Sequence, residues 1–197
     1  GEYCWFDPQA DAAPIHDPQM CQSNTTLDAA VTSGVVFAYD QYNNQIDKWE
    51  FDYGVAPVIG ADCPGSLGGF SRHTQMSYMG SPYTDITHNI LGLPQLVTIY
   101  EANNTIASMT HFGYDEYGQG ALSLTAAPGI AGHDSNYDSS FLIRGNLTNP
   151  AECLNPTNCI WINHVRDYDI AGNLVRQDDG NVHSTVFSYN DDGSNEY

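Results

Sequence analysis

The sequence predicts an all-β protein made of antiparallel hairpins and long loops, with little or no helix. Apolar and polar residues alternate between residues 31 and 54, which is the period of a half-buried strand. Turn dipeptides such as Gly172-Asn173 and Gly180-Asn181 separate such runs, and their residues tolerate positive φ. No stretch of about a dozen residues has the apolar period of a helix.

The first hairpin is expected at residues 31–54. Its first strand has an apolar face formed by Val35, Phe37 and Tyr39. After a turn at 40–44, the second strand places Trp49, Phe51 and Tyr53 on one face and Glu50 and Asp52 on the other. Residues 1–30 contain three prolines and no period, so we interpret them as a loop-rich N-terminal segment. Residues 31–197 are then one domain.

The remaining chain alternates between strand patterns and loops. Loops rich in small residues are expected at 55–70 and 119–139. Strands are expected at 71–80, 95–101, 106–114, 140–149, 160–168, 173–178 and 183–190.

Charge and composition limit the classes of partner. The net charge is −19 with a pI near 4.2, which argues against nucleic acid and against an anionic membrane surface. Thirteen Tyr, seven Phe and three Trp supply the apolar area that a folded core needs. No signal peptide and no apolar run long enough for a membrane helix is visible, and we interpret the chain as a piece of something longer. The composition is typical of extracellular or cell-surface β-proteins.

Five cysteines are present, and none forms a Cys-x-x-Cys motif. Cys153 and Cys159 bracket a short loop of turn residues, and Cys4 and Cys21 bracket a Pro-rich segment. We expect a disulfide in each pair, which an extracellular setting permits. Cys63 is left free or bridges to another chain, and buried free thiols are the alternative for all five.

Other candidate sites are sparse. Asn24, Asn103 and Asn146 begin Asn-x-Ser/Thr sequons and are candidate glycosylation sites. The histidines show no spacing that indicates a catalytic or zinc site, and we expect His111 and His183 on outward strand positions. Residues 191–196 resemble part of a calcium loop without its full spacing, so weak Ca²⁺ binding is the one cofactor considered. No enzyme motif appears.

A Phe-x-Tyr-Asp/Asn pattern recurs at expected strand ends. It begins at Phe37-Ala-Tyr39-Asp40, at Phe112-Gly-Tyr114-Asp115 and at Phe187-Ser-Tyr189-Asn190. A related stretch reads Tyr168-Asp169, then Gly172-Asn173-Leu174. These stretches resemble the RHS repeat, also called the YD repeat, over about residues 31–54 and 73–193. Chance hairpins are the alternative.

In the RHS family the repeats wind a long β-sheet into a hollow shell or barrel. The resemblance therefore implies a curved or wound sheet, with the motif residues in structural positions. We also expect Phe37, Phe112 and Phe187 to be buried. The self-cleaving core of the larger toxin shells, with its Arg-Tyr-Tyr-Asp-Pro stretch, is absent, so no toxin, nuclease or protease activity is implied.

The sequence thus favours an extracellular structural β-repeat protein that assembles with copies of itself into a filament, tube or shell. Open strand edges are expected near residues 31–40 and 185–189, which are nearly free of Lys and Pro. The alternative is a carbohydrate-binding or adhesive cell-surface module that uses exposed aromatic, Asn and Asp side chains. A hydrolase built on a β-scaffold is a third, weaker hypothesis.

Overall fold

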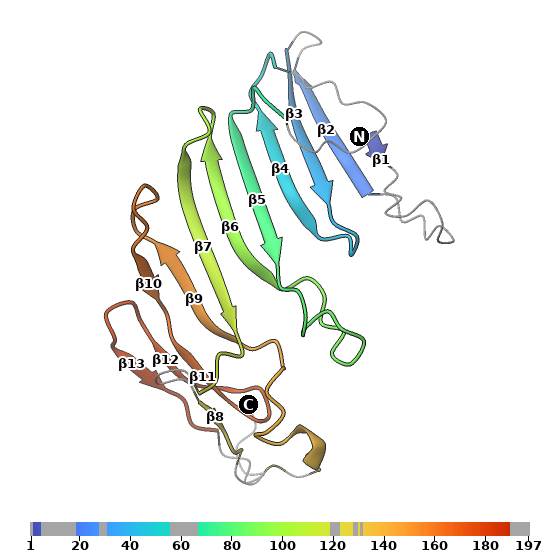
Figure 1. Cartoon of the computed structure of the whole chain (residues 1–197). Coiled ribbons are helices and arrows are strands. Elements are labelled where there is room, and N and C mark those ends of the chain that lie inside the picture. Colours follow the sequence, from blue (N-terminus) through green and yellow to red (C-terminus); the bar gives the residue numbers. More distant parts are fainter. Residues whose placement is uncertain are drawn as a thin grey trace. The chain divides into compact units, whose positions relative to one another are not determined.

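A computed structural model describes residues 2–4, 19–27, 31–55, 67–118, 123–127, 130 and 132–189 (Figure 1). Within these ranges the chain forms thirteen β-strands and one turn of 3-10 helix, Ser135–Tyr137. The expected all-β fold with little helix is confirmed. None of the described segments is a helix long and apolar enough to cross a membrane.

The strands form two sheets, and neither closes on itself within the described ranges. The larger sheet has the strand order β1-β2-β3-β4-β5-β6-β7-β9-β10. Its strands are β1 (Glu2–Cys4), β2 (Gln19–Leu27), β3 (Val31–Tyr39), β4 (Gln45–Phe51), β5 (Arg72–Tyr78), β6 (Pro94–Glu101), β7 (Ile106–Tyr114), β9 (Leu147–Cys153) and β10 (Trp161–Asn163). The smaller sheet has the order β13-β12-β11-β8, with β13 (Ser184–Val186), β12 (Leu174–Asp178), β11 (Arg166–Asp169) and β8 (Leu124–Thr125).

The chain divides into two compact units. The first comprises residues 1–78 and 96–109, and the second comprises residues 79–95 and 110–197. Strands β6 and β7 therefore contribute to both units.

The core of the first unit lies under β3 and β4. Val36 is directly opposite Trp49, and Gly34 is opposite Phe51. Val36, Trp49 and Phe51 are almost inaccessible to solvent. The predicted aromatic face of β4 is thus confirmed for Trp49 and Phe51. The predicted face of β3 is wrong by one residue, because small residues of β3 pack inside against these large rings.

The three repeated phenylalanines are not buried, which corrects the prediction. Phe37 is opposite Lys48 on the outer face and is only half-buried. Phe112 is also half-buried, and Phe187 is 37% exposed. Phe37 shares its register with a charged residue, whereas Phe112 is opposite Pro150 and the nearby Tyr114 is buried. The spacing of the motif therefore does not determine which of its aromatic residues packs inside.

The repeated Tyr-Asp motif forms the same hairpin loop twice. The Asp40 Oδ1 atom accepts hydrogen bonds from the backbone N–H of Tyr42 (2.8 Å) and of Asn44 (2.9 Å), and Oδ2 accepts one from the Asn44 side chain (3.0 Å). The Asp169 Oδ1 atom likewise accepts hydrogen bonds from the backbone N–H of Ala171 (2.9 Å) and of Asn173 (2.9 Å), and Oδ2 accepts one from the Asn173 side chain (3.0 Å). The fourth residue of each loop has positive φ, at Asn43 and Gly172. The expected turn roles of Asp169 and Gly172 are confirmed.

The next loop has the same bonds but a different fourth residue. Asp179 accepts hydrogen bonds from the backbone N–H of Asn181 (2.8 Å) and His183 (2.9 Å). Its left-handed residue is Val182, with φ 64°, and not the predicted Gly180. Gly180 has another role: a Cβ placed there would lie 2.2 Å from the Ile162 Cγ2 atom. Gly180 is therefore required for close approach to β10.

The Asp115 copy of the motif forms no hairpin. Its carboxylate accepts three consecutive backbone N–H bonds, from Arg144 (2.8 Å), Gly145 (2.7 Å) and Asn146 (2.9 Å). The Arg144 guanidinium in turn donates to backbone carbonyls, including those of Phe141 (2.7 Å) and Ile170 (2.9 Å). The strand predicted at 140–149 therefore begins only at Leu147, because the backbone donors before it bind Asp115 and not a neighbouring strand.

Other predicted boundaries also change. Residues 19–27, expected as loop, form β2, which pairs with β3 in continuous register from Gln22↔Val36 to Leu27↔Val31. The loop expected at 119–139 contains β8, which pairs in parallel with β11. The strand expected at 160–168 is divided into β10 and β11, which belong to different sheets.

Candidate functional site

The first candidate site is the free edge of β13. This strand is the last in the smaller sheet and pairs with β12 only, with Arg176 opposite Val186 and Gln177 opposite Thr185. The Phe187 N–H continues the pairing by donating to the Val175 carbonyl (2.9 Å). The other side of β13 has no strand partner among the described residues.

Every residue from 184 to 189 is exposed, and none is charged. Val186 is 73% exposed, Phe187 37% and Tyr189 38%. This edge carries none of the charged side chains or prolines that commonly prevent strand addition, although β13 itself is only three residues long. The other predicted open edge, at residues 31–40, is wrong, because β3 lies between β2 and β4 inside the larger sheet.

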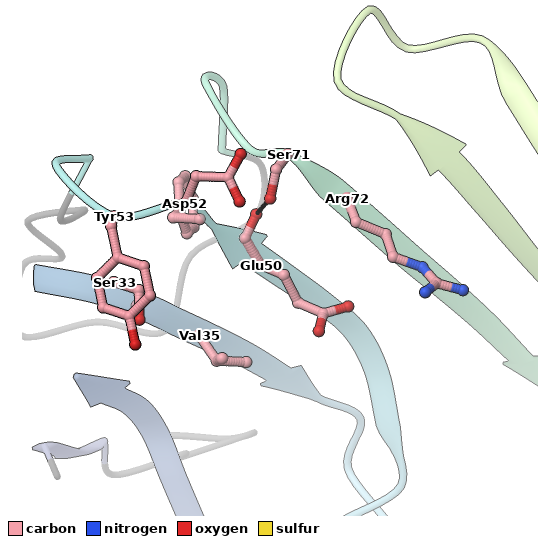
Figure 2. A pocket seen from close by; sticks show the side chains of 9 residues that line it. Ser33, Val35, Glu50, Asp52, Tyr53, Ser71 and Arg72 are labelled. Atoms are coloured by element: carbon pink, nitrogen blue, oxygen red, sulfur yellow. Dashed lines mark hydrogen bonds between the residues drawn. The ribbon is translucent and has the colours of Figure 1, made fainter. Parts of the chain in front are cut away.

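The second candidate site is an open groove in the first unit (Figure 2). It has a volume of about 340 Å³ and lies where β3, β4 and β5 end. The side chains that give it chemical character are those of Ser33, Glu50, Asp52, Tyr53 and Arg72. It thus combines carboxylates, a guanidinium, hydroxyls and an aromatic ring.

Backbone hydrogen bonds hold both walls of the groove. The turn after β4 is closed by a bond from the Val55 N–H to the Asp52 carbonyl (3.1 Å), and Gly54 adopts φ 94° at its third position. This is the geometry of a type II turn, with Tyr53 at the exposed second position. The Gly54 N–H donates to the Thr32 carbonyl (2.9 Å), which joins the turn to β3.

The opposite wall is fixed by Ser71. Its N–H (2.8 Å) and its hydroxyl (2.9 Å) both donate to the Glu50 carbonyl, so the start of β5 is held against β4. Arg72 is directly opposite Glu50 in the strand register. Figure 2 shows the Tyr53 ring and the Arg72 guanidinium on opposite sides of Glu50.

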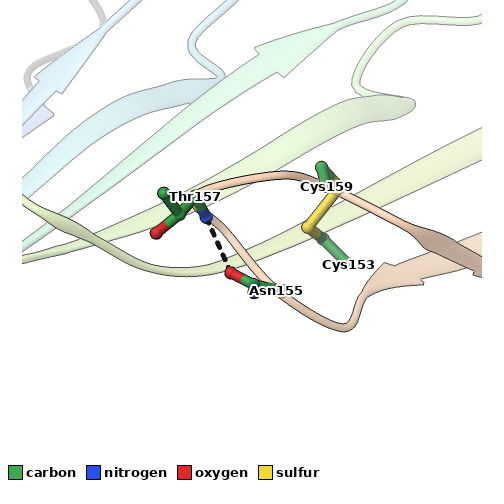
Figure 3. The surroundings of a disulfide bond; sticks show 4 residues. All are labelled: Cys153, Asn155, Thr157 and Cys159. Atoms are coloured by element: carbon green, nitrogen blue, oxygen red, sulfur yellow. Dashed lines mark hydrogen bonds between the residues drawn. A yellow bond between two sulfur atoms is a disulfide. The ribbon is translucent and has the colours of Figure 1, made fainter.

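The predicted bridge between Cys153 and Cys159 is present (Figure 3). Their Cα atoms are 5.4 Å apart, and the enclosed loop contains a turn in which the Thr157 N–H donates to the Asn155 side chain (3.0 Å). The bridge closes the hairpin between β9 and β10. Cys4 and Cys21 lie on the paired strands β1 and β2, but their side chains and Cys63 lie outside the described part of the structure.

The three sequons differ in accessibility. Asn24 is exposed on β2, and Asn103 is exposed in the loop between β6 and β7. The Asn103 side-chain oxygen accepts hydrogen bonds from the N–H (3.0 Å) and hydroxyl (2.6 Å) of Thr105. Asn146 is half-buried, and its Nδ2 donates to the Tyr117 hydroxyl (2.6 Å).

Three of the histidines, His73, His88 and His183, each pair with one carboxylate. The His73 Nε2 atom lies 2.7 Å from the Asp47 Oδ1 atom, and its ring is stacked between Trp49 and Tyr100 at centroid distances of 5.0 and 5.3 Å. This arrangement packs the His73 ring against the core of the first unit. The His183 side chain is 80% exposed and pairs with Asp179.

The remaining histidine and acidic candidates do not converge. His111 is half-buried, with its ring edge-on to Trp161 at 6.0 Å, so its predicted solvated position is only partly found. No three His, Cys, Asp or Glu side chains within the described ranges gather into a metal site. The calcium-like stretch 191–196 lies outside those ranges.

A buried ionic network stabilises the smaller sheet. Arg176 donates to the buried carboxylates of Asp167 (2.6 Å) and Asp178 (2.9 Å). The hydrogen bond to Asp167, together with the negative charges of both carboxylates, raises the pKa of the guanidinium. The second oxygen of Asp167 accepts the Ser123 N–H (2.8 Å), and that of Asp178 accepts the Ser184 hydroxyl (2.5 Å). The network ties β8 and β13 to the centre of the sheet.

Sequence reasoning missed the groove, because its residues come from three strand ends and share no motif. The one local signal was Tyr53-Gly54, an aromatic residue at a turn position next to a glycine that tolerates positive φ. No family model matches the chain, and none of the curated proteins is significantly similar to it.

Proposed function

We propose that this chain is an extracellular structural β-repeat protein that assembles with copies of itself through the exposed edge of β13. The observation that carries the proposal is an edge of six consecutive exposed, uncharged residues, 184–189. In the proposed assembly the chain acts as wall material, similar to that of the RHS family, in a curved or wound sheet. Its role there is structural and not enzymatic.

The recurrent hairpin loop supports the repeat interpretation. Asp40, Asp169 and Asp179 each use one carboxylate oxygen to bind two backbone N–H groups of their own loop. Each loop therefore ends one strand and starts the next with the same geometry. Such a unit can add one strand after another to a sheet.

Electrostatic repulsion opposes assembly but does not reach far. The net charge is −19, and charges on the surface repel one another over about 8 Å at ~0.15 M salt. The edge itself carries no charge from 184 to 189. Backbone pairing and burial of Val186 and Phe187 act locally, and burial contributes about 25 cal/mol per Å² of apolar area. Added salt should therefore favour assembly.

The edge with which β13 pairs determines whether the assembly is an open filament or a closed dimer. If β13 pairs with a different edge of the next copy, the contact is heterologous and a filament or tube grows. If two copies of β13 pair with each other, the assembly closes as a dimer. We propose the first arrangement. The disulfide between Cys153 and Cys159 supports an extracellular or cell-surface location, because such bonds persist in oxidising compartments.

Light scattering across a salt and concentration series tests the proposal. The wild-type chain should increase in mass with salt, and Phe187→Lys should lower that mass to the monomer because a charge interrupts the edge. Tyr42→Lys is the matched control: it makes the same change of aromatic to cation at a ring that is 42% exposed in a hairpin loop. Equal masses for wild type and Phe187→Lys at all salt concentrations would refute edge assembly.

A further inference from the structure

We propose that the groove at the ends of β3, β4 and β5 binds a short neutral oligosaccharide. The groove belongs to the first unit and shares no residue with the β13 edge, so this binding site does not depend on the proposed assembly. Its volume of about 340 Å³ lies at the lower end of the range for small-ligand pockets, which is roughly 300–1,000 Å³.

The groove exposes polar groups that no part of the described structure satisfies. The Asp52 carboxylate, the Tyr53 hydroxyl and the Arg72 guanidinium form no hydrogen bond with any described residue. All three side chains are exposed and line the same groove. A guanidinium offers five donors and a carboxylate accepts through two oxygens, so each can bind sugar hydroxyls, which both donate and accept.

The charges in and beside the groove balance. Glu50 is paired with Lys48 (3.0 Å), and Asp52 faces the groove together with Arg72. Two negative and two positive side chains therefore lie at this site, although the whole chain carries −19. An anionic ligand would gain little here and would be repelled by the rest of the surface. A ligand rich in hydroxyls and without charge fits better.

The Tyr53 ring supplies the apolar contact. It is 50% exposed, so one side of the ring is accessible to a ligand in the groove. The turn closed by Val55 and anchored to Thr32 holds its backbone before any ligand arrives. A sugar ring has an apolar C–H face and a hydroxyl rim, so one unit of an oligosaccharide can stack on Tyr53 while the hydroxyls of neighbouring units bind Asp52 and Arg72 (Figure 2). Pre-organisation of this kind lowers the cost of binding.

The test uses the full chain and a panel of neutral oligosaccharides of the cello-, malto- and chito- series, with sulfated oligosaccharides as the anionic comparison. Ligand-observed NMR followed by titration should identify binding to at least one neutral series. Tyr53→Ala and Arg72→Ala should each weaken that binding at least tenfold. Both side chains are exposed, so neither substitution disturbs the core.

Tyr42→Ala is the control, because Tyr42 is similarly exposed and lies in the loop at the other end of the same two strands. It should leave binding unchanged. Phe187→Lys should also leave binding unchanged, which separates this site from the assembly edge. Binding to sulfated sugars alone, no binding to any neutral sugar, or an unaltered affinity in Tyr53→Ala would each overturn the proposal.

Discussion

Asp169 binds Asn173 with both oxygens of its carboxylate: Oδ1 accepts the backbone N–H at 2.9 Å, and Oδ2 accepts the side-chain Nδ2 at 3.0 Å. Asp40 binds Asn44 through the same two contacts, at 2.9 and 3.0 Å. One pair lies in each compact unit. The shared geometry explains why the loop begins with Asp and has a side chain that can bind its second oxygen at the fifth position, which is Asn in these two loops and His183 in the loop of Asp179.

Replacing Asp169 should therefore destabilise the second unit. Asp169→Ala removes the acceptor of three hydrogen bonds at a site that is 5% exposed, and we expect a loss of about 1–3 kcal/mol in the free energy of unfolding. Urea unfolding followed by circular dichroism measures it. Asp138→Ala, at an exposed loop aspartate, is the control and should cost much less. Equal effects of the two substitutions would contradict the role assigned to Asp169.

Replacing Val182 should stabilise the protein. This residue is β-branched, 80% exposed and held at φ 64°, a conformation that such residues rarely adopt. Val182→Asn should raise the free energy of unfolding by about 1 kcal/mol, because Asn tolerates this conformation as Asn43 does in its own loop. Val186→Asn is the matched control, since Val186 is 73% exposed but lies in a strand. A stabilisation shared by both variants would point to the loss of exposed apolar surface instead.

Gly180 should not tolerate a side chain. A Cβ there would lie 2.2 Å from the Ile162 Cγ2 atom, so Gly180→Ala forces Ile162 or the loop to move and should cost about 1–3 kcal/mol. Ile162→Ala removes the opposing methyl group. The double variant should then lose less stability than the sum of the two single changes, which thermal unfolding of all four proteins can measure. Additive losses would show that the two residues are not in contact.

Tyr117 should make stability sensitive to alkaline pH. Burial, reinforced by the charge of Asp115, raises the pKa of its phenol to about 12 from 10.0, although the bond from Asn146 acts in the opposite direction. The folded state thus favours the protonated phenol. The stability from this group is complete below pH ~10 and is lost as the pH rises towards ~12. Tyr117→Phe should flatten the pH dependence in that window.

Denaturant midpoints measured from pH 8 to pH 11.5, together with tyrosinate absorbance, check this. Tyr83 and Tyr114 also have pKa values raised mainly by burial, so the Tyr117→Phe variant keeps part of the dependence. Tyr42→Phe, at an exposed ring, is the control. An identical alkaline profile for wild type and Tyr117→Phe would contradict the assignment.

The sequence predicted the secondary structure better than it predicted which face of each strand is buried. The turn at 40–44 and the left-handed Gly172 were correct, because Asp, Asn and Gly have strong local preferences for these positions. The burial of Phe37 was wrong, because alternation shows that two faces differ without showing which one packs. In β3 the buried face is the one on which Val36 packs opposite Trp49, and this is a contact between two strands.

The candidate sites were also predictable where they depend on local sequence and not where they depend on contacts between strands. The disulfide between Cys153 and Cys159 was predictable because it closes a local loop. The edge at residues 185–189 was predicted from its composition, and β13 does lie at a sheet edge. The strand at 31–40 was not an edge, since β2 forms from a segment with no visible period. The groove depends on where three strands end, which local patterns do not encode.

The pairing of β8 with β11 bears on the order in which the second unit folds. Ser123, next to β8, donates to Asp167 in β11 across 44 residues, whereas the loop from Asp179 to His183 spans a separation of only 4. Closing the longer loop costs more chain entropy, and hairpins form within roughly 1–10 μs. The strands β11, β12 and β13 should therefore assemble as a meander first, and β8 should join last. Amide hydrogens of β8 would then be the first in this sheet to exchange with solvent. Local unfolding of the sheet would accordingly begin with the separation of β8 from β11.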